Sequence, residues 1–304
     1  MLGLGSSLTS LYTPGETAYI ATTSFDLDGS DDYINLGNSW ALKQRVTDTS
    51  EGVGLSAATW FKLDDIQTTG TTHILMHCVQ YPGGWSFYYS NTRIYAVCNI
   101  GGASRSANLS VNTGWRTLGT DASPLRASGW HHVGMTFDGR YLKLYLNGSQ
   151  YATVGDAGSD DNYIHHDSGS PGTDGATQPT CSDYHDTDLL IGADPGALSN
   201  DGSGCGLSGS ASGSYNLAGL INEAAVWNKV LSEDCFSEIY EAVNTDGAVL
   251  DLTKNSGNYT NSGDLVALYR GDSIDGTTAT NVANPGTHDG SMKNSVGTSS
   301  TVPS

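Results

Sequence analysis

Hydrophobic and polar residues alternate over short stretches along most of the chain, and glycine, asparagine and aspartate separate these stretches. Alternation of this kind is typical of half-buried strands. Two dipeptides, Asp138-Gly139 and Asn147-Gly148, favour two-residue hairpin turns, so residues 130–154 are predicted to form a three-stranded meander. The side chains expected on its core face are those of Val133, Met135, Phe137, Leu142, Leu144 and Leu146.

One segment has helical spacing instead. Phe236, Ile239, Tyr240 and Val243 recur at the intervals of one helix face, and Ser232 stands where a helix-capping side chain is preferred. This predicts one short amphipathic helix that packs on a sheet. Many short strands with a single helix predict an all-β protein, either a β-sandwich or a jelly roll.

Composition narrows the classes of function. The chain has 304 residues, 13 Lys and Arg against 32 Asp and Glu, and a net charge of −19. A protein that binds nucleic acid needs a basic patch, so this class is excluded. The 39 glycines and the scarcity of good helix formers exclude a helical bundle. No apolar run is long enough for a membrane-spanning helix.

Two further features concern the compartment. The start, Met1 to Leu8, lacks the basic and apolar regions of a secretory signal, so we expect synthesis in a host cytoplasm; an extracellular location is the alternative. Three cysteines in apolar or helical surroundings are expected to be buried thiols, and the remaining two are the pair considered for a disulfide. The thiols are Cys78, Cys98 and Cys235, and the pair is Cys181 and Cys205.

Five segments carry a resemblance to a known family: 24–37, 55–63, 130–148, 189–192 and 217–232. In their order and spacing they resemble the laminin-G-like branch of the concanavalin A-like lectin/glucanase superfamily, which includes the pentraxins. The resemblance implies a two-sheet antiparallel jelly-roll sandwich.

The resemblance also divides the chain. The jelly roll is expected at 24–243, with a long acidic insertion at 155–188. An N-terminal arm, 1–23, precedes it, and a C-terminal extension, 244–304, follows with an added strand near 265–269.

Catalysis is not predicted. Glycosidases with this fold carry a Glu-x-Asp-x-Glu pattern that places two carboxylates in one groove, and the chain does not contain it. Glu223 lies in a predicted core strand, where we expect a structural role.

Calcium is the cofactor that the resemblance implies. Similarity to the pentraxins nominates Asp194 and, more weakly, Asp201 and Gln80. Asp28 and Asp31 form an independent candidate, because hard cations prefer oxygen ligands on turning loops. The alternative is that the turn containing them is an ordinary Asx turn.

Aromatic rings are the candidate ligand contacts. Tyr81, Trp85 and Tyr88 belong to a turn and strand expected to be exposed, and Trp115 is a further candidate. The alternative is that these rings cap the core. Simple alternation also places His73 and His77 on one face of a strand.

These features predict a non-enzymatic virion surface protein: a capsid decoration, head-fibre or tail-adhesin subunit. The start of the chain resembles that of laminin-G-like phage proteins. Its expected partners are other virion subunits, further copies of itself and cell-surface carbohydrate. The alternative is a secreted calcium-dependent lectin or carbohydrate-binding module.

Overall fold

The computed structural model describes most of the predicted strands and the whole C-terminal extension beyond residue 247. The described residues are 18–37, 42, 54–64, 72–78, 84–90, 93–102, 105–112, 129–139, 141–155, 163–164, 188–194, 199–200, 207–208, 215–243 and 248–304.

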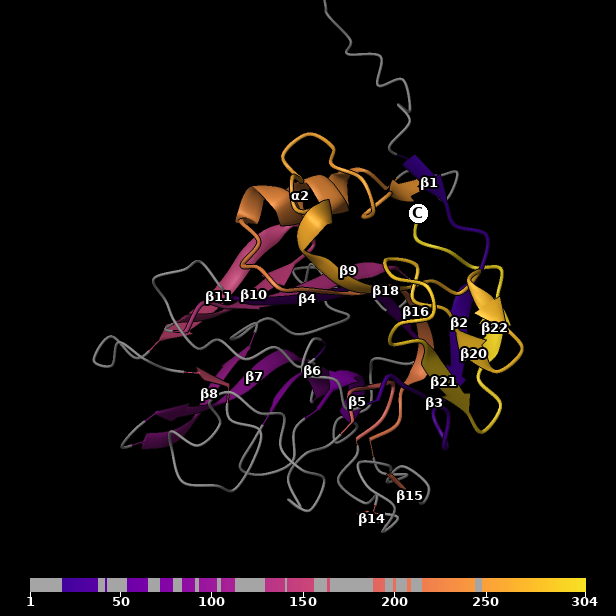
Figure 1. Cartoon of the computed structure of the whole chain (residues 1–304), viewed down its shortest axis with the longest axis horizontal. Coiled ribbons are helices and arrows are strands. Elements are labelled where there is room, and N and C mark those ends of the chain that lie inside the picture. Colours follow the sequence, from indigo (N-terminus) through magenta and orange to yellow (C-terminus); the bar gives the residue numbers. More distant parts are fainter. Residues whose placement is uncertain are drawn as a thin grey trace, which may run out of the picture.

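Among these residues, two large antiparallel sheets of eight and ten strands lie face to face (Figure 1). We call them sheet 1 and sheet 2. Sheet 1 contains β2 (Ser24–Asp28), β4 (Leu55–Leu63), β9 (His131–Phe137), β10 (Tyr141–Leu146), β11 (Ser149–Gly155), β16 (Ala218–Trp227), β18 (Leu265–Tyr269) and β22 (Gly297–Ser299). Sheet 2 contains β3 (Tyr33–Asn35), β5 (Thr72–His77), β6 (Trp85–Ser90), β7 (Arg93–Gly102), β8 (Arg105–Asn112), β12 (Tyr163–Ile164), β13 (Leu190–Ile191), β19 (Ile274–Asp275), β20 (Thr278–Ala279) and β21 (Gly290–Lys293).

Two short ribbons complete the described strands. In one, β1 (Ala18–Ile20) pairs with β17 (Ala248–Leu250), and in the other, β14 (Ser199–Asn200) pairs with β15 (Leu207–Ser208). The predicted all-β jelly-roll sandwich is therefore confirmed.

The main core lies between the two sheets. The predicted meander is confirmed as β9, β10 and β11, and the six side chains expected on its core face are all buried there. Asn147 and Gly148 both have positive φ, 48° and 81°, as the turn between β10 and β11 requires. Cys78, Cys98 and Cys235 are buried thiols, as expected; Cys181 and Cys205 lie outside the described residues.

A second core lies on the outer face of sheet 1. Helix α2 (Glu233–Glu241) buries Phe236 and Ile239 there, and the Ser232 side chain caps it by accepting from the Cys235 amide. The predicted helix and its cap are thus confirmed. A three-residue 3-10 turn, Ser262–Asp264, leads into β18. None of the described helices has the length and apolar character that a membrane span requires.

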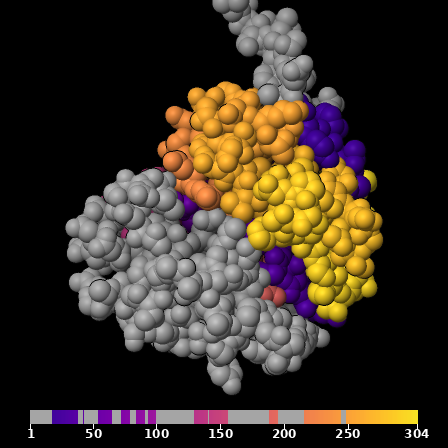
Figure 2. All heavy atoms as spheres, in the orientation of Figure 1, coloured from indigo at the N-terminus to yellow at the C-terminus, as the bar shows by residue number. Residues whose placement is uncertain are grey.

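The C-terminal extension joins both sheets. Its strand β18, the one expected near 265–269, pairs with β16, while β22 pairs with β2 in sheet 1 and β21 pairs with β3 in sheet 2. Figure 2 shows the extension, orange to yellow, packed against the early strands in indigo. The extension therefore closes one side of the sandwich.

Candidate functional site

The outer face of sheet 2 is polar and aromatic where β5, β6 and β7 lie side by side. In β6 the residues Trp85, Phe87 and Tyr89 enter the main core. The alternate residues, Ser86, Tyr88 and Ser90, line a groove on the opposite side. Side chains alternate between the two faces of an extended strand. The aromatic residues of β6 are therefore divided between the core and the groove.

A β-bulge in β5 decides which histidine reaches the groove. The pairing with β6 shifts between Ile74 and Met76, and a bulge of this kind changes the phase of alternation. His77 consequently lines the groove together with Ile74. His73 turns away: its ring lies 5.7 Å from that of Tyr89, and its Nδ1 accepts from the Ala218 amide. The expectation that both histidines share one face is therefore wrong.

The groove is a cavity of about 400 Å³. Strands β5 to β7 form its floor, while Asp194, just after β13, and Tyr215, just before β16, come from neighbouring segments. Its described lining residues are Thr72, Ile74, His77, Ser86, Tyr88, Ser90, Val97, Asp194 and Tyr215.

Polar side chains in the groove are held by one another. His77 Nδ1 and Ser86 Oγ are hydrogen-bonded at 2.8 Å, and His77 Nε2 lies 3.6 Å from an Asp194 carboxylate oxygen. The hydroxyls of Thr72 and Ser90 are 2.8 Å apart. Because these contacts fix the rotamers before a ligand arrives, the groove is pre-organised for hydrogen bonding.

Tyrosine rings supply the apolar part of the surface. The ring of Tyr88 stacks on that of Tyr95 across the β6–β7 pair, with centroids 5.2 Å apart and planes 11° from parallel. Burial, and then the neighbouring Tyr95, raise the pKa of Tyr88, so its hydroxyl keeps its proton at neutral pH. Tyr215 is 41% exposed at the rim.

The structure tests part of the site expected from the sequence. It brings Tyr88 and Asp194 together in one groove. It also shows that the expected exposure of Trp85 is wrong: the side chain is 0% exposed and stacks on Phe87 in the core. Four of the expected site residues lie outside the described residues; these are Gln80, Tyr81, Trp115 and Asp201. Sequence reasoning missed Ser86, although alternation in β6 contains that signal.

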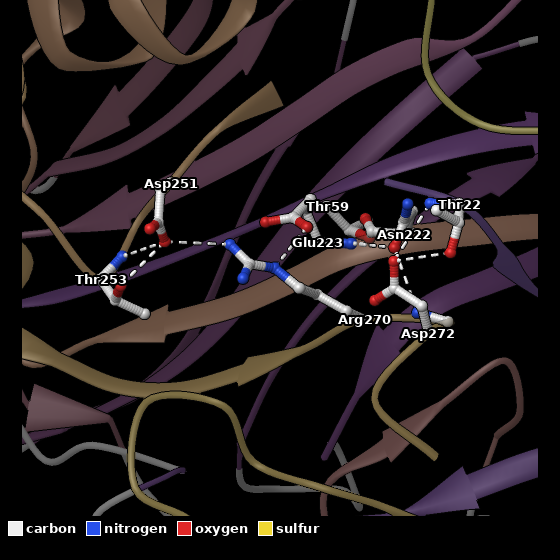
Figure 3. A network of polar contacts seen from close by, with 9 residues as sticks. Thr22, Thr59, Asn222, Glu223, Asp251, Thr253, Arg270 and Asp272 are labelled. Carbon is white, nitrogen blue, oxygen red and sulfur yellow. Dashed lines mark hydrogen bonds and ion pairs between the residues drawn. The ribbon is translucent and has the colours of Figure 1, made fainter. Parts of the chain in front are cut away.

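A second polar cluster lies on the opposite side of the molecule, at the outer face of sheet 1 (Figure 3). Arg270, which follows β18, donates from Nε to Glu223 at 2.7 Å and from Nη2 to Asp251 at 3.3 Å. Its guanidinium also lies 3.8 Å from the centre of the Tyr19 ring. We call these four residues the Arg270 cluster.

The Arg270 cluster occupies a junction in sheet 1. The first half of β16 pairs with β2 and its second half pairs with β18 along the same edge. Asn222 and Glu223 lie where the partner changes, at a bulge in which Glu223 has φ 51°. The Asn222 side chain accepts from the Gly271 amide there. Glu223 is 3% exposed, so it holds the junction together and faces no groove.

The sequence comparison decides the family. The model of the family Laminin_G_3, described as the concanavalin A-like lectin/glucanases superfamily, matches residues 28–190 of the 304. The chain belongs to this superfamily. No curated protein sequence matches the chain.

Solved structures match parts of the chain at low identity. A protein from Bacteroides ovatus described as carbohydrate-binding has 12% identity and a TM-score of 0.49, covering 92% of this chain and 60% of that one. The heptameric SAP-like pentraxin of Limulus polyphemus has 13% identity and a TM-score of 0.39, covering 75% of this chain and 86% of that one. The ligand-binding domain of botulinum neurotoxin serotype D, solved with N-acetylneuraminic acid, has 13% identity and a TM-score of 0.40, covering 74% of this chain and 45% of that one.

Of the three residues that the pentraxin resemblance nominates for calcium, Asp194 is the one that the structure describes. Asp194 faces the His77 ring, and its two companions lie outside the described residues. Within the described part of this superfamily member, one group of three or more His, Cys, Asp or Glu side chains lies close enough to share an ion. That group is at the turn after β2, and it consists of Asp28, Asp31 and Asp32.

Proposed function

We propose that the chain is a non-enzymatic glycan-binding protein and that the groove on the outer face of sheet 2 holds the sugar. The observation that carries this proposal is the set of side chains in the groove. Tyr88 and Tyr215 offer rings that stack on the apolar face of a pyranose. The hydroxyls and Asp194 offer the hydrogen-bond partners that sugar hydroxyls require.

The charge of the groove favours a neutral sugar. Asp194 is the carboxylate among its described lining residues, and the chain as a whole carries −19. An acidic sugar would place its own carboxylate or sulfate beside Asp194, which is unfavourable. A single carboxylate also differs from the pair that glycosidases use, which supports a binding role over hydrolysis.

The test compares two tyrosines of equal exposure. Tyr215 in the groove is 41% exposed, and Tyr141 on β10 is 40% exposed. A glycan array on the wild-type chain identifies bound sugars, and titration calorimetry then measures their affinity for Tyr215→Ala and Tyr141→Ala. We expect neutral glycans to bind, Tyr215→Ala to weaken binding by roughly tenfold, and Tyr141→Ala to leave it unchanged.

Three results would contradict this proposal. One is an array without any bound glycan, and another is equal binding by the two tyrosine variants. The third is release of reducing ends from a bound polysaccharide by the pure protein, which would replace the binding role with an enzymatic one.

We propose further that the protein works on the surface of a virus particle. What supports this is the arrangement of the faces: α2, β1 and β17 lie on the outer side of sheet 1 (Figure 1), whereas the groove lies on the outer face of sheet 2. Attachment to other subunits on the α2 side would leave the groove open to a host surface. Mass spectrometry and imaging of purified particles test this; absence of the chain from particles would overturn it.

A secreted calcium-dependent lectin is the second candidate. It is favoured by Asp194, the described member of the calcium set that the pentraxin resemblance implies. Repeating the glycan array with a chelator separates the two: loss of every bound glycan supports the calcium-dependent lectin, and unchanged binding contradicts it.

A further inference from the structure

The turn between β2 and β3 brings three carboxylates together. β2 ends at Asp28 in sheet 1 and β3 begins at Tyr33 in sheet 2, so this turn crosses from one layer of the sandwich to the other. Ligand atoms of Asp28, Asp31 and Asp32 all lie within 4.8 Å of one another. Asp28 and Asp31 are exposed, whereas Asp32 is 4% exposed.

Hydrogen bonds within the turn satisfy only part of these groups. Asp28 accepts from the Ser30 amide at 2.7 Å, which is the Asx turn that the sequence suggests, and Asp32 Oδ2 accepts from the Asp28 amide at 3.3 Å. The other oxygen, Asp32 Oδ1, is buried and has no hydrogen-bond partner. A buried carboxylate oxygen without a partner is costly.

The charge of the turn is also uncompensated. Among the described residues, no Lys or Arg forms an ion pair with Asp28, Asp31 or Asp32. Like charges at this spacing repel one another.

An independent observation comes from a distant segment. Asn216, just before β16, is 4% exposed, and its Nδ2 donates to the Ser30 carbonyl inside the turn. The same amide has its Oδ1 buried without a hydrogen-bond partner. Asp32 Oδ1 thus belongs to the turn, and the Asn216 side chain, which carries the second buried oxygen without a donor, is held at the turn by its Nδ2 from a segment far away in sequence. A trapped water would satisfy a buried oxygen of this kind but would leave the charge of the three carboxylates unbalanced.

We propose that Asp28, Asp31, Asp32 and Asn216 bind one calcium ion. Calcium takes six to eight oxygen ligands in flexible geometry, so carboxylates, one amide oxygen and water suit it, whereas Mg²⁺ demands a near-ideal octahedron. The ion ties the crossing between the two sheets to the start of β16. Asn294 donates to the Asp31 carbonyl at 2.8 Å, which extends the tie to the C-terminal extension. This metal site is separate from the glycan groove and does not depend on it.

The experiment uses the full chain stripped with chelator and titrated with CaCl₂ by calorimetry, together with thermal unfolding. We expect wild-type protein to bind calcium and its Tm to rise to a plateau as the site fills. In Asp31→Asn, the loss of one charged, exposed ligand should weaken binding at this site by at least roughly tenfold and reduce the rise in Tm. Asp275→Asn, in the exposed β19–β20 hairpin, is the matched control and should behave as wild type.

Asn216→Ala is the second variant, and it should weaken calcium binding while Asp275→Asn does not. The proposal is overturned if wild-type protein gives neither a calcium-dependent heat nor a change in Tm. It is equally overturned if Asp31→Asn binds as many ions, with the same affinity, as Asp275→Asn. No readout involves a glycan, so failure here leaves the proposed function untouched.

Discussion

Each outer face of the sandwich carries a pair of acidic and basic side chains, and the two pairs differ in how far they are covered. On sheet 1, Glu223 pairs with Arg270 beneath the C-terminal extension, and both side chains are at most 4% exposed. On sheet 2, Asp194 lies beside His77 in a groove, with side-chain exposures of 21% and 11%. A covered acid and base stabilise a junction between strands, whereas an accessible pair is available to a ligand. Coverage, rather than residue type, therefore separates the polar groups that hold strands together from those that remain open to a ligand.

The largest effect is expected on the covered face. Arg270→Met leaves the Glu223 carboxylate buried without its partner, so the free energy of unfolding should fall by about 3–5 kcal/mol. Urea unfolding followed by tryptophan fluorescence measures the loss. The double variant Arg270→Met with Glu223→Gln has no unpaired buried charge, so it should recover part of the lost free energy of unfolding. A loss below about 1 kcal/mol would mean that the Arg270 cluster behaves like a surface ion pair.

The next largest effect is the pH dependence of the free energy of unfolding that buried Glu223 causes on the covered face. Burial raises the pKa of Glu223 from 4.5 to about 7, although Arg270 opposes the rise. An acid whose pKa is higher in the folded state binds its proton more tightly there, so its contribution to the free energy of unfolding falls as the pH rises between these two values. Relative to Glu223→Gln, the wild type should lose on the order of 3 kcal/mol over this window.

Urea unfolding of both proteins at about pH 5 and about pH 7.5 measures this difference. A wild-type curve parallel to that of Glu223→Gln would show that Arg270 fully offsets the burial of the carboxylate.

A third prediction concerns the hydrogen bonds beneath the extension. Tyr259 is buried, and its hydroxyl accepts from Trp227 Nε1 at 2.9 Å and donates to the Leu252 carbonyl at 2.8 Å. Tyr259→Phe leaves the Trp227 Nε1 donor and the Leu252 carbonyl without their hydrogen-bond partner, so it should lower the free energy of unfolding by about 2 kcal/mol. Tyr141→Phe, at 40% exposure, should be neutral. Equal stability of the two variants would contradict a structural role for the extension's contacts.

The smallest effect on stability is expected in the groove. Asp194→Asn should change the free energy of unfolding by no more than about 0.5 kcal/mol and should weaken the affinity for a bound neutral glycan by roughly tenfold. Calorimetry with the glycan found on the array measures the second quantity. A large loss of stability with unchanged glycan affinity would assign Asp194 to the same structural class as Glu223.

Local pattern predicted the elements of this protein well. The meander, the helix with its Ser232 cap and the strand near 265–269 all follow from periodicity and turn residues that act over a few positions. The candidate site was only partly predictable: Tyr88 and Asp194 lie in one groove, whereas Trp85, which the sequence suggests is exposed, enters the core. Trp85 and Tyr88 lie in one aromatic run, and which of them enters the core depends on the facing sheet.

The sequence by itself determined the strands, their turns, the helix and the superfamily, because these depend on local spacing and on segments in a fixed order. Only the tertiary structure decided the placement of polar groups that are distant in sequence. The bulge in β5 rotated His77 into the groove, the change of partner along β16 buried Glu223 against Arg270, and Asn216 reached the turn after β2. Each of these depends on contacts between strands, and the alternation within a single strand carries no record of them.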